Sequence, residues 1–211
     1  MLNKVFIFFA MFLGIIGFSN ASTQFTLFEQ EGISLSIPVG QEWKELSNQK
    51  IQEIKENATK IDGLKRRSDT LLILESNTGK IRLSTKPLYD ASIGLENDLA
   101  ELLKPESLSD KKEFIADMLE QQKSIFKRLE QKSNMKISNI NISLNEINRN
   151  IAIVISYIRS SNDGKGDWYV NQYHFTDSNN KRTIIFTLSH SVDSDANVKL
   201  TLDKVLSSFK F

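Results

Sequence analysis

Cysteine is absent from this sequence, so the chain has neither disulfides nor cysteine-ligated metal centres. Histidine is scarce, with two residues, which leaves no zinc-ligand spacing and few candidates for a catalytic base. The chain also has no excess charge of one sign, because it contains 27 basic and 26 acidic side chains. Such a balance argues against nucleic-acid binding, which depends mainly on Lys and Arg neutralising phosphates. We therefore expect no cofactor, no metal and no nucleic-acid partner.

Proline is rare as well, and its three residues are Pro38, Pro87 and Pro105. No internal repeat, low-complexity tract or Pro/Gly-rich linker divides the chain after its first residues. A chain of this length can bury most of its unfolded surface in one core without cross-links. We therefore expect one domain over residues 22–211.

The first residues have the layout of a secretory signal peptide. Lys4 is followed by an uncharged apolar run, Val5–Phe18, and then by small residues around Ala21. A membrane-spanning helix needs roughly 20 apolar residues, and this run is shorter, so a retained anchor is the less favoured alternative. No second such run follows, so the mature chain should have no transmembrane segment. We expect cleavage near Ala21 and a periplasmic or secreted protein, and export without cysteine favours a bacterial source.

Hydrophobic periodicity predicts a mixed α/β (α+β) fold. The apolar residues of Ile33–Ile37 alternate with serines, which indicates a strand that ends at Pro38. Further strands are predicted over residues 70–75, 80–86, 137–144, 150–159, 167–176 and 182–190, and helices over residues 47–63, 92–104, 110–131 and from 195 onward. Tight turns at residues 76–79 and 177–180 join neighbouring strands. The pattern predicts a mainly antiparallel β-sheet flanked by helices.

The longest predicted helix, residues 110–131, is amphipathic. Asp110 and Glu113 have the spacing of a capping box at its start. Its apolar stripe consists of Phe114, Ile115, Met118, Leu119, Ile125, Phe126 and Leu129. A stripe of this kind is more often a core face than a membrane or partner face, so we expect it to pack on the sheet.

The two ends of the chain resemble the PsbP-like superfamily. In the stretch Gly32–Lys44 a first strand runs into Pro38 and, a few residues later, Trp43. The chain ends in Leu206–Phe211 after aromatic-rich strand pairs, as these proteins often do, and the resemblance covers most of residues 25–211. It implies an α/β/α sandwich and a protein that binds without chemistry of its own, as do an extrinsic photosystem subunit, a nuclear Ran-binding factor and periplasmic proteins of the DcrB type. No functional residue of the family has a motif match here.

Candidate site residues are few. His190 is in register with the apolar residues of its strand, which favours a structural histidine at the rim of the core. The group Trp168, Tyr169, Tyr173 and His174 could line a ligand pocket, although sheet packing is the simpler interpretation of aromatic residues in a strand. We identify no catalytic residues, so a hydrolase is the least favoured function and no enzymatic activity is expected.

A calcium loop is suggested at first sight by the acidic residues that begin at Asp193, but the glycine and the glutamate that such a loop needs are missing. Asp195 is better explained as a helix cap. The leading functional hypothesis is an accessory protein that binds another protein or an envelope component. The alternative is a small-molecule or lipid carrier with a pocket between the sheet and the helices.

Overall fold

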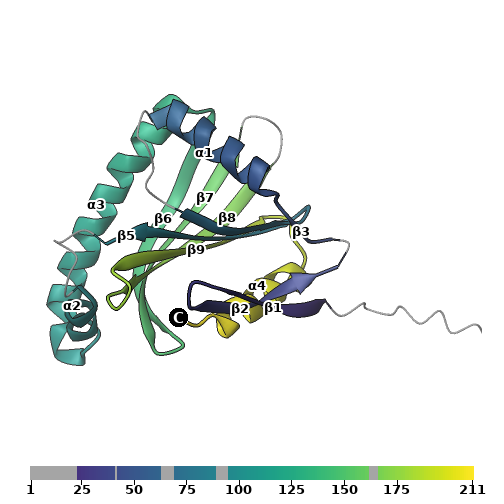
Figure 1. Ribbon diagram of the computed structural model, residues 1–211. Coiled ribbons are helices and arrows are strands. Elements are labelled where there is room, and N and C mark those ends of the chain that lie inside the picture. Colours follow the sequence, from purple (N-terminus) through teal and green to yellow (C-terminus); the bar gives the residue numbers. More distant parts are fainter. Residues whose placement is uncertain (1–22, 41, 63–68, 89–94, 162–165) are drawn as a thin grey trace, which may run out of the picture.

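The computed structural model describes residues 23–40, 42–62, 69–88, 95–161 and 166–211 (Figure 1). The predicted signal peptide, residues 1–21, lies outside these ranges. The described chain forms a seven-stranded sheet of order β3-β4-β5-β9-β8-β7-β6 and a separate two-stranded ribbon, β1-β2. All paired strands run antiparallel, so the predicted fold class is confirmed.

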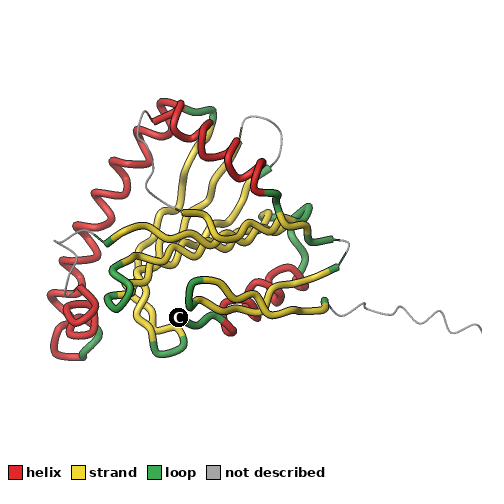
Figure 2. Tube along the Cα trace, viewed as in Figure 1, coloured by secondary structure: helices red, strands yellow, loops and turns green. Residues whose placement is uncertain are grey.

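The strands are β1 (Gln24–Gln30), β2 (Ile33–Val39), β3 (Lys44–Glu45), β4 (Asp69–Glu75), β5 (Gly79–Pro87), β6 (Met135–Ile147), β7 (Asn150–Ser161), β8 (Asp167–Asp177) and β9 (Arg182–Ser191). The helices are α1 (Asn48–Asp62), α2 (Leu95–Leu102), α3 (Leu108–Lys132) and α4 (Ala196–Ser208), with a short 3-10 turn, Pro105–Ser107, before α3. Both predicted hairpins, β4–β5 and β8–β9, are present. Helices α1, α2 and α3 lie on one side of the large sheet, and α4 lies on the other side with the ribbon (Figure 2).

The β1-β2 ribbon departs from prediction in two ways. β1 was not expected, because the adjacent apolar residues Leu27 and Phe28 break its alternation. β2 does not end at Pro38 but pairs through it to Val39. The N–H groups of Ser34 and Ser36 point away from β1, toward the C-terminal segment. Pro38 shares their orientation by strand alternation, so its missing N–H removes no hydrogen bond to β1.

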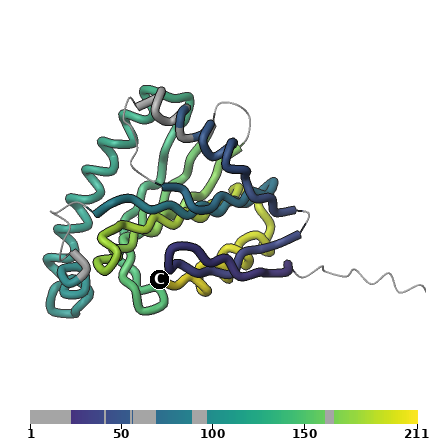
Figure 3. The backbone as a smooth tube through the Cα atoms, in the orientation of Figure 1, coloured from purple at the N-terminus to yellow at the C-terminus, as the bar shows by residue number. Residues whose placement is uncertain are grey.

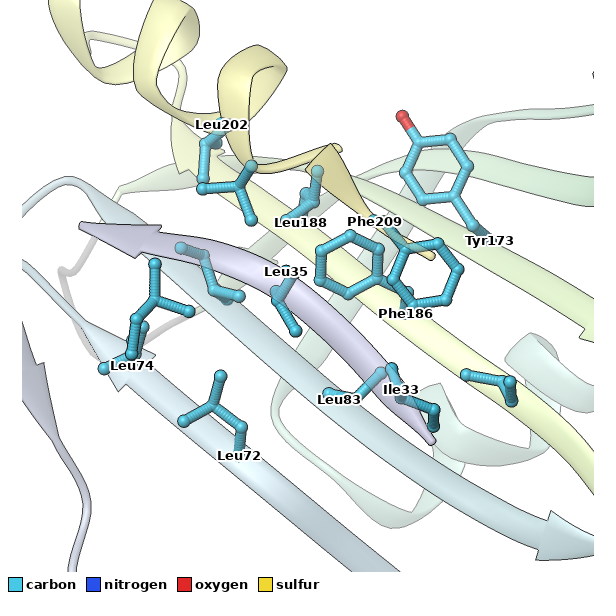
Figure 4. Close-up of a cluster of buried hydrophobic side chains, with 14 of the residues drawn as sticks. Ile33, Leu35, Leu72, Leu74, Leu83, Tyr173, Phe186, Leu188, Leu202 and Phe209 are labelled. Carbon is cyan, nitrogen blue, oxygen red and sulfur yellow. The ribbon is translucent and has the colours of Figure 1, made fainter. Parts of the chain in front are cut away.

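The main core lies between the large sheet and the layer of β1, β2 and α4 (Figure 4). Its largest fully buried side chains include Phe175, Phe186 and Phe209. The Phe209 ring lies 5.1 Å from the Phe186 ring and 4.9 Å from the Phe175 ring, measured between centroids. Beyond Phe209 the chain pairs with β2 through the Ser34–Lys210 bridge, which places the C-terminus beside the ribbon (Figure 3). The last residues are therefore part of the core.

A second, smaller apolar cluster joins α2 and α3 to β6 and β7. Phe126 is the buried residue of α3, so the predicted core face of this helix is confirmed there. Ile125, which was assigned to the same stripe, is 42% exposed. Consecutive residues of an α-helix are about 100° apart around its axis, so Ile125 lies to one side of Phe126. Ile125 is therefore at the edge of the apolar stripe, and only the centre of the stripe packs on the sheet. In the described residues no helix has the length and apolar character needed to span a membrane.

The helix ends follow local capping chemistry. The Ser47 hydroxyl accepts a hydrogen bond from the backbone N–H of Lys50 at the start of α1. The Asp195 carboxylate accepts one from the N–H of Val198, so the predicted cap of α4 is confirmed. Asp110 is not a cap, because α3 begins earlier, at Leu108. The 3-10 turn that starts at Pro105 leads directly into the helix, and Asp110 therefore lies in its first turn.

Gly79 gives the first testable prediction, because it follows the β4–β5 turn beneath Trp43. A Cβ atom at Gly79 would lie 2.7 Å from the Trp43 ring and 3.0 Å from Val198 Cγ1. Trp43 is buried, so it has little room to move. We expect Gly79→Ala to lower the free energy of unfolding by about 1–3 kcal/mol, the usual cost of overpacking, as measured by urea denaturation. Gly32→Ala is a useful comparison, since a Cβ there meets no atom within 4 Å and only its positive φ of 74° opposes the change. A Gly79→Ala variant as stable as the wild type would contradict the close packing of Trp43.

Candidate functional site

The four residues predicted to line a pocket divide between the two faces of β8. Tyr173 belongs to the main core, so Tyr169, at even spacing from it, shares the ribbon-side face. Trp168 and His174 alternate with these tyrosines and lie on the opposite, helix-side face, where α2 and α3 pack. The structure therefore brings Trp168 and His174 to one side of the sheet and does not bring all four residues together.

The two tyrosines have different surroundings on the ribbon-side face. Tyr173 is buried, its ring centroid lies 6.4 Å from that of Phe186, and burial raises the pKa of its phenol. Tyr169 is 41% exposed, and its ring centroid lies 5.3 Å from that of His190. Tyr173 is therefore part of the main core, and Tyr169 lies at the edge of that core.

His190 lies near the end of β9, and its contacts do not form a catalytic set. Its Nδ1 atom is 2.8 Å from the Ser191 carbonyl oxygen and 2.9 Å from the Ser194 hydroxyl. A hydrolytic histidine would contact the serine with one ring nitrogen and a carboxylate with the other, whereas here both contacts involve the same nitrogen. His190 is half-buried and satisfied by its own turn, which confirms the structural interpretation.

The helix-side face of β5, β9 and β8 is polar, which is unusual for a sheet face that helices border. Gln172 on β8 pairs with Thr187 on β9, and Thr187 pairs with Arg82 on β5, so these side chains form a row across three strands. The next row contains His174, Ile185 and Ser84. Lys86 lies farther along β5 on the same face by strand alternation. The helix-side face of these three strands thus carries hydrogen-bonding groups and positive charge.

His174 is the least satisfied group in these rows. Its Nε2 atom is buried and has no hydrogen-bond partner among the described residues. Burial, and to a smaller extent the nearby charge of Lys86, lower the pKa of His174 to about 4. The imidazole is therefore neutral at physiological pH. Since an unpaired buried polar atom costs about 1–3 kcal/mol, a ligand that bonded to this nitrogen would recover free energy.

The polar rows border the second apolar cluster directly. His174 pairs with Ile153 and Gln172 pairs with Ile155, and both isoleucines belong to that cluster. The Gln172 amide donates a hydrogen bond to the Tyr157 hydroxyl over 3.3 Å, and the Tyr157 ring lies 4.7 Å from that of Phe126 on α3. Helix α3, the apolar strand β7 and the polar strand β8 thus form one continuous amphipathic surface.

Two surface depressions are lined by none of the residues of these polar rows. One of about 400 Å³ lies at the β3–β4 edge and is lined by Glu42, Lys44, Leu46, Glu75, Ser76 and Asn77. The other, of about 510 Å³, lies where α3 leads into β6 and is lined by Glu130, Ser133, Asn134, Met135, Lys136, Ile137 and Ser138. Neither includes a residue predicted from the sequence as part of a site. Within the described ranges, no cluster of His, Asp and Glu has the arrangement of a metal site.

Sequence reasoning missed the polar residues of β5 and β9 that share the helix-side face with His174. The signal was present, because Lys80, Arg82 and Ser84 alternate with the apolar residues Ile81 and Leu83 along one predicted strand. That alternation shows a polar face on β5. It does not show which strand lies beside β5, and the pairing of β5 with β9 is a long-range contact that depends on tertiary structure.

Comparisons with known proteins give likeness at the level of structure. No protein-family model matches the sequence, and no curated protein matches it. The solution structure of cyanobacterial PsbP (CyanoP) from Synechocystis sp. PCC 6803 is similar with a TM-score of 0.50 and 13% identity, over 94% of this chain and 98% of that one. The PsbP-like fold inferred from the two ends of the sequence is therefore confirmed.

Two further structures are more distant. One, from Bacteroides thetaiotaomicron VPI-5482, has a TM-score of 0.45 and 9% identity, over 90% of this chain and 48% of that one. The other is PA94 from Pseudomonas aeruginosa, described as a protein of unknown function, with a TM-score of 0.37 and 13% identity, over 87% of this chain and 94% of that one.

Proposed function

We propose that this chain, which has the PsbP-like fold, is a non-catalytic accessory protein that is exported to the cell envelope and acts by binding a protein there. Export is supported by the signal-peptide layout of residues 1–21, and the absence of cysteine in an exported chain favours a bacterial envelope. Action by binding is what the family resemblance implies. The described residues that could support catalysis, His174 and His190, lie on opposite faces of the sheet, which is consistent with such a role.

The observation that carries the proposal is a set of exposed apolar side chains on the ribbon and α4. Leu27 on β1 is 66% exposed and Leu200 on α4 is 57% exposed. The two elements meet where the Lys204 amine lies 5.6 Å from the centroid of the Phe25 ring. Phe25 shares the strand face of Leu27, and Lys204 is one helical turn from Leu200. We call these four residues the ribbon surface; exposed apolar groups near a lysine suit a protein interface.

We expect a Leu27→Ser, Leu200→Ser double variant to lose partner capture. Burying two leucine side chains in an interface contributes roughly 1.5–3 kcal/mol each, so the crosslinked yield should fall at least about fivefold. The measurement is crosslinking of the tagged protein in its native cell, followed by mass spectrometry, with the intact mass showing whether the mature chain begins at Ser22.

Leu108→Ser is the matched control, because Leu108 is 57% exposed but lies at the start of α3, away from the ribbon. One dominant envelope partner, lost in the double variant and kept in the control, would support the proposal. A wild-type protein that captures no partner, or one that is recovered with residues 1–21 attached, would overturn it.

One observation favours the second candidate function, a small-molecule or lipid carrier. The helix-side layer contains the smaller of the two apolar clusters formed by the described residues, together with the buried His174 Nε2 atom, which has no hydrogen-bond partner among those residues. A carrier needs apolar space with a few polar groups that fix the orientation of the ligand, and this face has both kinds of surface.

A further inference from the structure

The edge strands β3, β6 and β1 differ in how they are protected from pairing with another chain. β3 has only two residues. β6 has a bulge between Ser138 and Asn141, and its Ile137 N–H donates a hydrogen bond to the Glu130 carboxylate over 2.6 Å. Short length, bulges and covered backbone groups all limit strand addition at a sheet edge. β1 is a seven-residue edge strand with an uninterrupted register and neither proline nor lysine, so it lacks the usual protection.

The backbone groups of Phe25, Leu27 and Glu29 point to the outer edge of β1. Glu29 is paired with Ser34, whose N–H and C=O groups bond to Lys210 on the side away from β1. Residues directly opposite each other in an antiparallel pair turn these groups either both inward or both outward, so those of Glu29 point away from β2. Leu27 and Phe25 share this orientation by strand alternation. In the described part of the chain no strand pairs with this edge, so it can accept a strand from another chain.

The sequence of β1 is complementary to itself in an antiparallel arrangement. Leu27 is the central residue of Gln24–Gln30, and it is the most exposed large apolar side chain of the described residues, at 66%. If two copies of β1 pair about this centre, Leu27 meets its own counterpart, and Phe25 lies opposite Glu29 of the second copy. The pairing therefore covers an apolar side chain that the single chain exposes to water.

Charge complementarity favours a second copy as the occupant of this edge. The Lys204 amine lies 5.6 Å from the centroid of the Phe25 ring. Neither Lys204 nor Glu29 forms an ion pair with a residue in the described ranges. Because Glu29 of the second copy would lie beside Phe25, its carboxylate would be close to the Lys204 ammonium. Twofold symmetry makes the same contact a second time, in the opposite direction.

We infer that, in the absence of its envelope partner, this chain forms a twofold dimer through β1, and that the dimer covers the ribbon surface. Pairing through one strand of seven residues buries far less than the roughly 1,200–2,000 Å² of stable complexes, so the dimer is weak. It dissociates on dilution and when the envelope partner binds. The covering of a partner site rests on the proposed function, whereas the pairing of β1 with itself does not.

The first test is disulfide crosslinking of Leu27→Cys, because the chain contains no other cysteine. The Cα atoms of a directly opposite, hydrogen-bonded pair are about 5.5 Å apart, which suits a disulfide. The two copies of Glu29 would be separated by about 13 Å along the strands. Under mild oxidation of the chain that begins at Ser22, we expect Leu27→Cys to form covalent dimers at least about tenfold faster than Glu29→Cys. Leu108→Cys, at a 57% exposed position of α3, measures random collision. Equal rates at positions 27 and 29, or at 27 and 108, would overturn the inference.

The second test is sedimentation equilibrium of the same chain over a dilution series, with the charges exchanged. Glu29→Lys and Lys204→Glu should each weaken dimerisation by about fivefold, because each places like charges side by side at two symmetric contacts. The double variant Glu29→Lys, Lys204→Glu should restore it. Lys199→Glu, at an exposed position of α4, is the matched control and should leave dimerisation unchanged. A wild-type chain that is monomeric at every concentration, or a double variant as weak as the single ones, would contradict the pairing.

Failure of this inference and failure of the accessory function are distinguishable, because dimerisation is measured on the purified chain and partner capture is measured in cells. A chain that dimerises but captures no envelope protein would overturn the accessory function alone. A chain that captures its partner but stays monomeric would overturn the dimer alone.

Discussion

Phe209→Ala is expected to lower the free energy of unfolding by about 3–5 kcal/mol, the usual cost of removing a fully buried aromatic ring. Phe209 has no exposed surface, and its ring contacts those of Phe175, Phe186 and Phe211. It is also close to the C-terminus, where truncation is often tolerated, so a large effect would show that the terminal segment is structural. Urea denaturation monitored by circular dichroism measures the change.

Phe114→Ala on α3 is the comparison for this experiment. Phe114 is half-buried in the helix-side layer, so its removal should cost less, about 1–2 kcal/mol. The difference between the two variants measures how much more deeply Phe209 is buried than Phe114. Equal costs would contradict the full burial of Phe209 or the partial burial of Phe114.

The second large effect is the dependence of stability on pH through His174. The pKa of this residue is about 4 in the folded chain and about 6.5 in the unfolded chain, so the unfolded state binds more protons between these values. Stability is therefore full above about pH 6.5 and falls as the pH decreases toward 4. The shift corresponds to a loss of about 3 kcal/mol across this range.

A series of urea denaturation curves between pH 7.5 and pH 4 measures the loss, and His174→Leu is the matched variant because leucine cannot be protonated. Asp177, whose pKa is lowered by hydrogen bonds from Asn180 and Arg182 despite its burial, also makes stability fall with pH, but below about pH 4 and equally in both proteins. We expect a flatter curve for His174→Leu. Parallel curves would show that His174 is not the group that titrates.

Local sequence patterns were sufficient for the strands whose alternation is uninterrupted and for the helices with clear caps. β8 and β9 were predicted nearly to the residue, and Asp195 was identified as the cap of α4. Strand alternation and helix capping both depend on residues that are close together in the sequence. β1 was missed because its stability comes from pairing with β2 and from the core beneath, neither of which its own seven residues reveal.

The candidate site was predictable in part. His174 was grouped with Tyr169 and Tyr173 as possible pocket lining because the three residues are close in sequence. The period of a strand already places these tyrosines on the face opposite His174. The position of Lys86 near His174 could not be predicted, since it requires β9 to lie between β5 and β8. Strand order of this kind is set by the packing of the whole domain.

The central claim, that the ribbon surface is where this protein binds its partner, is tested most directly by site-specific photocrosslinking. A photoreactive amino acid is placed at Leu27 in one strain and at Leu108 in another, and each is illuminated in living cells. The account predicts one dominant crosslinked envelope protein from position 27 and none from position 108. Crosslinking to the same protein from position 108 alone, or none from position 27, would contradict it.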